Sequence, residues 1–294
     1  MIRRQEINKG RYLPARGLAL ALLCLLSLKS IAGPAATDET SELELTNFAF
    51  ATYLGSGFYS TGNLKLFVLR IPLSSELSET ATEKAGLVLH YPVTVGVARI
   101  DDELNLPEIG DIIDVNNVAT VSVVPGLEYG VPMAKNWYLG PFVDLGIARD
   151  FANNTNIGVG GIGAKSFINF DYDHGRLVIA NRLLYAQQNN LESGISTHFS
   201  SFETGLEYSF PSGFRLGDSP VDFSFYFVNY HYIDDLVIGG PIEDRISLQN
   251  KNEAGFTFSL PKHDWLPDNS RLGFGVQVTR DSDFYRIVFG SPFF

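Results

Sequence analysis

The sequence has almost no cysteine, and its only cysteine, Cys24, lies in an apolar stretch near the N-terminus. A lipid-modified cysteine needs a small residue before it, and Leu23 stands there instead. We expect this stretch to be removed, which leaves a chain without cysteine. Such a chain forms no disulfide and has no thiol chemistry.

The chain is also poor in basic residues, with 22 Lys and Arg against 33 Asp and Glu. Six of the basic residues and one acidic residue lie within residues 1–32, so the remainder carries 16 basic and 32 acidic residues and a formal charge of −16. No basic patch remains that suits a nucleic acid, and we exclude that class of partner. No later segment is long and apolar enough for a membrane helix.

The first 32 residues have the organisation of a secretory signal peptide. Arginines and lysines precede an apolar run over residues 17–28, which is too short to span a bilayer. Small residues at Ser30 and Ala32 suit cleavage before Gly33. We predict a cleaved signal peptide over residues 1–32 and a short periplasmic lead over residues 33–44. A signal-anchor helix that stays attached is the alternative.

Residues 117–150 alternate strictly between two kinds of side chain, which is the signature of β-strands. One row is apolar: Val121, Val123, Pro125, Leu127, Tyr129 and Val131, then Trp137, Leu139, Pro141, Val143, Leu145 and Ile147. The other row is small, polar or charged and includes Thr120, Ser122, Glu128 and Asp144. In a soluble sandwich the apolar row faces a core. In an outer-membrane barrel it faces lipid, while the polar row lines the lumen.

Composition favours the barrel over the sandwich. The chain is acidic, 13% aromatic and rich in glycine, which is typical of a barrel with an apolar outside and a wet inside. Only helices and closed barrels satisfy their backbone groups within lipid. We therefore predict an all-β fold, a transmembrane antiparallel up-and-down β-barrel of about 12 strands over residues 45–294.

The predicted strands follow one another without helical interruption, and their even number places both chain ends on the periplasmic side. In the last strand the apolar row Tyr285, Ile287, Phe289 and Phe293 is out of step with Phe294, and Pro292 breaks the ladder, so we expect a bulge there. The strands are predicted over residues 45–54, 63–73, 85–100, 117–132, 137–150, 156–168, 176–187, 197–210, 220–232, 245–260, 270–280 and 283–294.

Three stretches resemble a known family. PGLEYGVPMAKNWYLGPFVDLG, residues 125–146, resembles a hairpin of the solitary outer-membrane autotransporter-like β-barrel family of Gram-negative bacteria. FAFATYLGSGFYS followed by LFVLRIPL resembles that family's opening strands. The resemblance implies a 12-stranded translocator-like barrel standing without a passenger. The roughly 12 residues before the first predicted strand would span only about 18 Å as a helix, too little to thread a barrel and emerge as a passenger.

The alternation places ten charged side chains on the inward face. They either form a paired network that fills a narrow interior, or line a diffusion channel as a selectivity filter. Acidic residues outnumber basic ones six to four, so a channel is expected to prefer cations mildly. The ten are Arg70, Glu128, Asp144, Arg176, Arg182, Glu203, Glu207, Asp222, Glu253 and Arg271.

The longest predicted loop, residues 101–116, carries six carboxylates. It is either a solvated acidic loop or a divalent-cation site beside lipopolysaccharide, although its spacing matches no EF-hand. Apolar residues within it offer a third interpretation, a loop folded inward as a plug: Leu104, Leu106, Ile109 and Ile112. We predict no metal ligands.

Two clusters combine histidine with carboxylates, the arrangement that activates water. One is Asp171, Asp173 and His174, and the other is His231, Asp234 and Asp235. Strand parity places them at opposite ends of the barrel, so they do not cooperate. The chain has no serine elbow, zinc signature or phosphate loop.

We therefore predict a non-enzymatic, monomeric protein of the cell outer membrane with no cofactor. A small porin-like channel is the first expectation. A structural or surface-interaction barrel with a plugged lumen is the alternative, and an outer-membrane hydrolase or protease is the second alternative. Its expected partners are outer-membrane lipid, lipopolysaccharide and the barrel assembly machinery.

Overall fold

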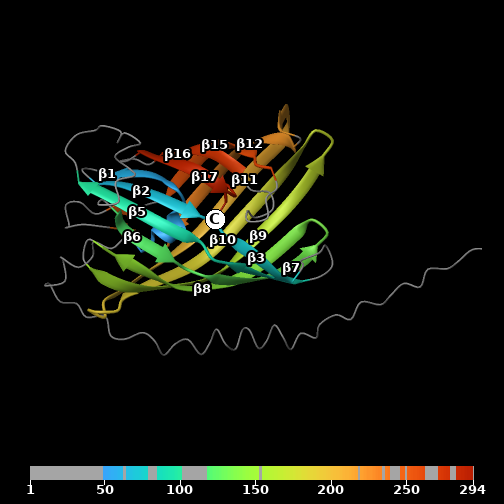
Figure 1. Cartoon of the computed structure of the whole chain (residues 1–294). Helices are drawn as coiled ribbons and strands as arrows, with labels where there is room; N and C mark the ends of the chain where they lie inside the picture. The colour runs from blue at the N-terminus through green and yellow to red at the C-terminus, as the bar shows by residue number, and fades with distance from the viewer. Residues whose placement is uncertain are drawn as a thin grey trace, which may run out of the picture. The chain divides into compact units, whose positions relative to one another are not determined.

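The computed structural model describes a closed antiparallel barrel that is almost wholly β (Figure 1). The chain divides into two units, Met1–Ser41 and Glu42–Phe294, and the described residues all belong to the second. Within them no helix is long and apolar enough to cross a membrane. The described residues are 49–61, 64–78, 85–100, 118–151, 154–217, 219–233, 236–238, 246–248, 250–261, 271–278 and 283–293.

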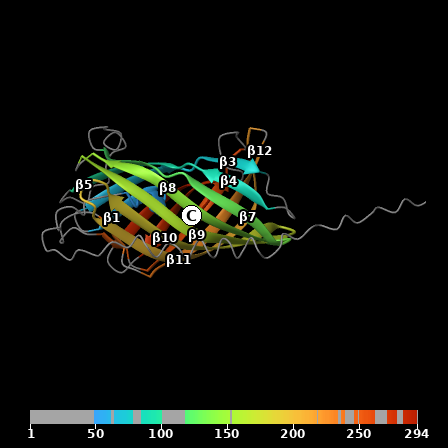
Figure 2. The ribbon, with the colours of Figure 1, turned by 90° about the horizontal axis from the view of Figure 1, so that it is seen from below.

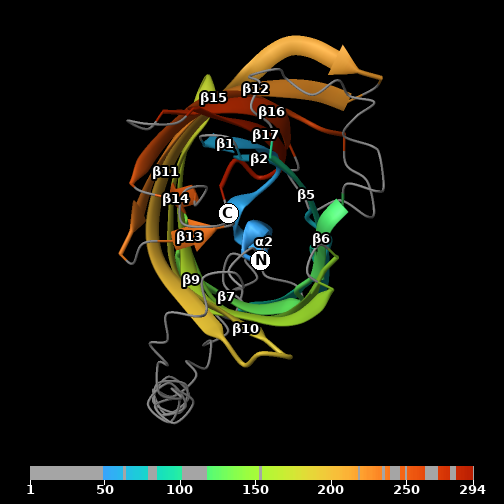
Figure 3. The same ribbon diagram turned by 90° about the vertical axis from the view of Figure 1, so that its left-hand side faces the viewer.

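Twelve strands form the wall, which confirms the predicted number and their antiparallel order. Each pairs with its neighbours in sequence, and β1 pairs with β17 to close the ring, with Gly57 opposite Arg286 (Figure 3). Nine wall strands are continuous: β1 (Gly57–Thr61), β8 (Trp137–Asp150), β9 (Thr155–Tyr172), β10 (Gly175–Asn190), β11 (Ser196–Leu216), β12 (Ser219–Tyr232), β15 (Lys251–Ser259), β16 (Arg271–Val278) and β17 (Asp283–Gly290).

The other three wall strands are each broken once beside a proline. The breaks fall at Pro72, Pro92 and Pro125, on neighbouring strands and opposite one another in register. Proline has no N–H to donate to a ladder, so the three aligned prolines interrupt the hydrogen-bonded ladder across three neighbouring strands. The halves are β2 (Leu64–Ile71) and β3 (Ser74–Ser78), β4 (Gly86–His90) and β5 (Val93–Ile100), and β6 (Val118–Val123) and β7 (Gly126–Ala134).

The alternation of residues 117–150 is realised with the apolar row outside. Leu145 is 74% exposed and Ile147 66%, whereas Glu128 is 5% exposed and Phe142 7%. The long slanting strands β8, β10 and β11 carry this pattern along one side of the barrel (Figure 2). The arrangement is the reverse of a soluble sandwich, because large apolar side chains face the surroundings while charged ones are buried.

The first wall strand lies later than predicted. Residues 51–54 form α2 (Ala51–Leu54), a single helical turn, and β1 begins at Gly57, where a turn was expected. The apolar pattern that predicted a strand instead packs into the barrel interior, where Phe50 and Ala51 are buried. Gly55 ends the helix with a φ of 84°, a backbone conformation that glycine adopts without strain. Predicted strand residues 45–48 lie outside the described residues.

The last strand and the tenth strand are both shorter than predicted. β17 ends at Gly290, which has a φ of 98°, and residues 291–293 leave the wall. Phe293 was predicted to face outward in a bulged strand, but it is buried in the interior at 3% exposure. The tenth wall strand, β15, begins at Lys251 and not at residue 245. Residues 246–248, expected within it, form β14 (Ile246–Leu248), which pairs with β13 (Leu236–Ile238) apart from the wall.

Candidate functional site

A plug formed by residues 49–56 occupies the barrel interior. Figure 3, which looks into the barrel, shows α2 surrounded by the wall strands. Phe50 packs edge-to-face on Phe199 of β11, with ring centroids 5.0 Å apart, and Tyr53 contacts the same ring at 6.1 Å. Phe142 and Leu184, near the middles of β8 and β10, complete this apolar cluster. The plug therefore packs against the inside of the wall near the middles of β8 and β10.

The C-terminal tail, residues 291–293, fills a second part of the interior. Phe293 packs in a cluster with Ala180 and Tyr226, from the two strands that flank β11. A Cβ on Gly205 would lie 2.4 Å from the Phe293 ring, so glycine is required at that position of β11. The guanidinium of Arg286 donates to the Pro292 carbonyl at 3.1 Å and holds the tail in place.

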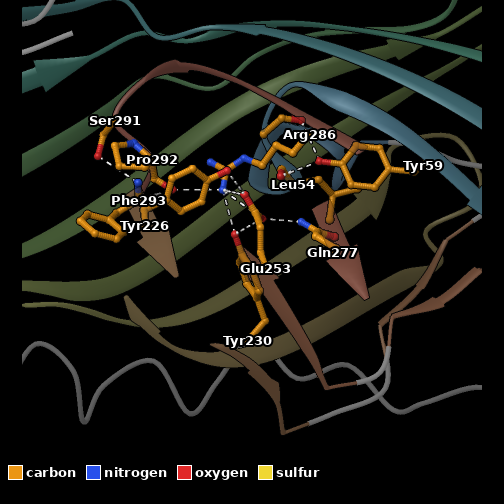
Figure 4. A network of polar contacts seen from close by, with 11 residues as sticks. Leu54, Tyr59, Tyr226, Tyr230, Glu253, Gln277, Arg286, Ser291, Pro292 and Phe293 are labelled. Atoms are coloured by element: carbon orange, nitrogen blue, oxygen red, sulfur yellow. Dashed lines mark hydrogen bonds and ion pairs between the residues drawn. The ribbon is translucent and has the colours of Figure 1, made fainter. Parts of the chain in front are cut away.

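Glu253 is the centre of the most extensive polar network (Figure 4). Its carboxylate is fully buried and accepts hydrogen bonds from Tyr226 at 2.6 Å, Gln277 at 2.6 Å and Tyr230 at 2.9 Å. Arg286 completes an ion pair with it at 3.3 Å. Because Arg286 also holds the tail, this network joins four wall strands, β12, β15, β16 and β17, to the C-terminal residues.

A second network surrounds Glu128 on β7. Lys165 of β9 donates to its carboxylate at 2.8 Å, Tyr138 of β8 at 2.6 Å, and the His90 ring of β4 lies within hydrogen-bond distance at 3.1 Å. Lys165 also lies 5.0 Å from the centroid of the Phe142 ring. The carboxylate is thus compensated from three strands, as a buried charge requires.

Two further ion pairs cross between strands inside the barrel. Arg182 on β10 pairs with Glu203 on β11, which also accepts from the Ser201 hydroxyl at 3.2 Å. Arg271 on β16 pairs with Glu207 at 3.1 Å and donates to Thr257 at 2.6 Å. Most of the interior charge is therefore arranged in cross-strand pairs.

Eight of the ten charged residues predicted to face inward are buried or line an interior cavity. The two others, Arg176 and Asp222, are exposed. Arg176 is the second residue of β10 and Asp222 the fourth of β12, so both lie near strand ends where they meet solvent. Arg176 also makes an ion pair of 2.9 Å with the exposed Asp171. The structure therefore places these two outside the buried interior, although they share the rows of the buried Arg182 and Ser224.

Several interior polar residues were missed by the sequence analysis. Arg286 lies between the outward Tyr285 and Ile287, so the alternation contained the signal for it. Lys165 lies in the glycine-dense β9, whose weak apolar pattern hid the register. The missed residues are His90, Lys165, Tyr226, Tyr230, Lys251, Gln277 and Arg286.

When the missed residues are included, the interior has as many basic residues as acidic ones, and the predicted excess of acidic residues disappears. Among the described side chains five carboxylates and four basic groups are buried, and Asp144, Arg70 and Lys165 line the cavity, which gives six of each sign. The buried nine are Glu128, Asp150, Glu203, Glu207 and Glu253, with Arg182, Lys251, Arg271 and Arg286. The six-to-four count behind an expected cation preference therefore does not describe this interior.

A cavity of about 270 Å³ lies between the plug and the C-terminal tail. Its polar lining includes Tyr53, Arg70 and Asp144, and none of the three side chains makes a hydrogen bond or ion pair with another described residue. Tyr53 belongs to α2, outside the wall strands, and burial together with the Asp144 carboxylate raises the pKa of its phenol, which stays neutral. This cavity is the candidate site.

The two predicted histidine clusters lie away from the cavity. His231 is exposed on the face of β12 opposite to the buried Tyr230, and Asp234 and Asp235 lie outside the described residues. Asp171, Asp173 and His174 are exposed at the turn between β9 and β10. The acidic loop 101–116, with its apolar residues, also lies outside the described residues. Across the described part of the chain no three His, Cys, Asp or Glu residues are grouped to hold a metal ion.

No protein-family model matches the chain, and no curated protein matches it significantly. The features of this chain that bear on its function are therefore the barrel, its plug and the cavity.

Proposed function

We propose that this chain is an integral outer-membrane β-barrel whose lumen is closed to free diffusion by its own segments. The observation that carries the proposal is the orientation of the alternation, with apolar side chains outside and paired charges inside. Val143 at 51%, Phe225 at 58% and Leu183 at 52% exposure belong to an apolar surface that runs over several strands. Such a surface is costly in water and suits lipid.

The packing of the plug and the tail inside the barrel favours a plugged barrel over an open porin. The plug and the tail meet apolar clusters of the wall, and each of the interior ion pairs joins neighbouring or nearby strands. Paired charges stabilise a filled interior, whereas a selectivity filter needs side chains that face a water column. The cavity offers a binding volume rather than a continuous path.

The setting of this barrel is part of the proposal. We place it in the cell outer membrane as a monomer, in contact with lipid and lipopolysaccharide and inserted by the barrel assembly machinery. The resemblance of residues 125–146 to the solitary autotransporter-like family supports that setting. The exposed position of His231 gives no support to a hydrolase or protease, so we propose a non-enzymatic role.

A gated channel is the second candidate function. The observation in its favour is that α2 is a single turn without a side-chain cap, adjacent to a cavity. Short elements with few hydrogen bonds open at low free-energy cost. Displacement of the plug would remove the apolar cluster around Phe199 and extend the cavity along the lumen.

Membrane insertion is tested by flotation of the refolded chain, residues 33–294, with lipid vesicles, together with heat-modifiable gel mobility. The wild type is expected to float and to shift on heating. Val143→Arg, in the middle of β8, is expected to lower the stability of the inserted barrel by about 2–4 kcal/mol. Leu216→Arg, at the exposed end of β11, is the matched control and is expected to have little effect. A wild type that stays out of the vesicles, or equal effects of the two substitutions, would contradict membrane insertion.

A further inference from the structure

The ladder that closes the barrel between its first and last strands is incomplete. β1 has only five residues, and it pairs with β17 from Gly57 opposite Arg286 to Tyr59 opposite Phe284. Before Gly57 the last contact comes from Ser56. Its carbonyl accepts from the Ile287 N–H at 3.1 Å, and its hydroxyl bonds to the backbone of Arg70.

Beyond Ser56 the two flanking strands no longer pair with each other. Among the described residues β3 pairs only with β4, and residues 288–290 of β17 pair only with β16. We call the unpaired boundary between residues 71–78 and residues 288–290 the seam. Its two edges carry backbone groups without a strand partner in the described part of the chain, in a wall that is otherwise closed.

The cavity reaches the seam. Its lining includes the inward Arg70 and Arg286, but also Ile287 and Phe289 of the outward row of β17, and Leu73 in the break between β2 and β3. The cavity therefore meets residues of both rows of β17 at the seam. The seam is the part of the wall beside the cavity that has no ladder to close it, and the contact of Pro72 with Gly290 narrows it.

The lining of this cavity includes two opposite charges that form no close ion pair among the described residues. Arg70 and Asp144 both line it, and they form no ion pair with each other or with any other described residue. The neighbouring charges are already compensated, Lys165 by Glu128 and Arg286 by Glu253. Arg70 would bind an anionic oxygen group, and Asp144 an ammonium. A ligand that carries both would satisfy both residues.

We propose that the seam admits an amphiphile with a zwitterionic headgroup of the phosphoethanolamine type. The headgroup enters the cavity, with its phosphate at Arg70 and its ammonium at Asp144, while its acyl chain lies outward against Leu73, Ile287 and Phe289. A cavity of about 270 Å³ accommodates a headgroup but not a whole lipid, which agrees with this division. This inference rests on the proposed membrane location.

The test measures binding to the refolded chain, residues 33–294, in neutral detergent micelles by native mass spectrometry and calorimetry. The probes are lysophosphatidylethanolamine, lysophosphatidylglycerol, dodecylamine and free phosphoethanolamine. We expect lysophosphatidylethanolamine to bind at one site, at least tenfold more tightly than each of the other three. The free headgroup separates a soluble ligand from a lipid, because it carries the same charges without a chain.

Substitutions assign the binding to the cavity. Arg70→Gln and Asp144→Asn are each expected to weaken lysophosphatidylethanolamine binding about tenfold, which corresponds to about 1.4 kcal/mol. Arg70→Gln is expected to reduce the discrimination against dodecylamine, and Asp144→Asn the discrimination against lysophosphatidylglycerol. Arg176→Gln, at an exposed position beside a turn, is the control and is expected to leave binding unchanged. Heat-modifiable gel mobility identifies variants that fail to fold. Ser74→Trp, at the seam, tests whether the lysolipid reaches the cavity through the seam, because it adds bulk without changing a charge.

Three results would overturn the inference. They are equal binding of all four probes, binding of free phosphoethanolamine as tight as that of the lysolipid, and binding that Arg70→Gln, Asp144→Asn and Ser74→Trp leave intact. A chain that floats with vesicles and does not bind overturns only this inference. A chain that does not float overturns the proposed function.

Discussion

The hydroxyl of Ser56 takes the place of a strand residue opposite Arg70. It accepts a hydrogen bond from the Arg70 N–H at 2.8 Å and donates one to the Arg70 carbonyl at 3.0 Å. A side chain thus satisfies both backbone groups of one residue, where a strand would otherwise be needed. Its position sets where the closed ladder ends and the seam begins.

Ser56→Ala is expected to destabilise the folded barrel by about 1–3 kcal/mol, because it leaves both backbone groups of Arg70 without this partner. Urea unfolding of the refolded protein, followed by tryptophan fluorescence, measures the change. Ser209→Ala removes a weaker, exposed hydrogen bond of 3.5 Å and is expected to change stability little. Equal midpoints for the two variants would show that Ser56 does not hold the seam.

Glu253→Gln is expected to cost about 3–5 kcal/mol, because it leaves the buried Arg286 without a counter-charge. The same unfolding experiment is applied to the double variant Glu253→Leu/Arg286→Met. Its loss of stability is expected to be smaller than the sum of the losses of Glu253→Leu and Arg286→Met measured singly, since both charges are then absent. Removal of the exposed pair through Arg176→Gln is expected to cost less than about 1 kcal/mol. A loss from Glu253→Gln as small as that from Arg176→Gln would contradict the central role given to this network.

Gly205→Ala is expected to displace the C-terminal tail, because its Cβ would lie 2.4 Å from the Phe293 ring. The rate of carboxypeptidase digestion of the folded barrel measures the displacement and is expected to rise several-fold. Gly160→Ala, where the nearest atom to a Cβ is 3.7 Å away, is the matched control. Unchanged digestion of Gly205→Ala would mean that the tail does not depend on this contact.

The barrel itself was readable from the sequence, because period-two alternation records which face of a strand meets which environment. The rows of residues 117–150 have the exposure that the alternation requires, and the predicted number of twelve strands is confirmed. Alternation does not distinguish an apolar residue that faces outward from one that packs inside. Residues 50–54 were therefore predicted as wall when they form the plug, and Phe293 was predicted as exterior when it lies in the tail.

The candidate site was only partly readable. Arg70, Glu128 and Asp144 follow from the alternation of their own strands. Lys165 lies on a strand where glycines blurred the register, whereas Arg286 could have been predicted from its position between Tyr285 and Ile287. The seam depends on where β1 begins relative to β17, a long-range pairing that no local pattern encodes. The cavity depends on that pairing, so it could not be predicted from the sequence and is found only in the structure.

Single-channel conductance of the refolded chain, residues 33–294, in a planar bilayer tests the closed lumen most directly. The wild type is expected to be electrically quiet after heat-modifiable mobility has shown that it is folded. Phe50→Ala/Tyr53→Ala, which removes the two plug rings that contact Phe199, is expected to produce discrete openings that scale with salt concentration. Steady openings of the wild type, with steps as large as those of the variant, would contradict the closed lumen and support an open porin-like channel instead.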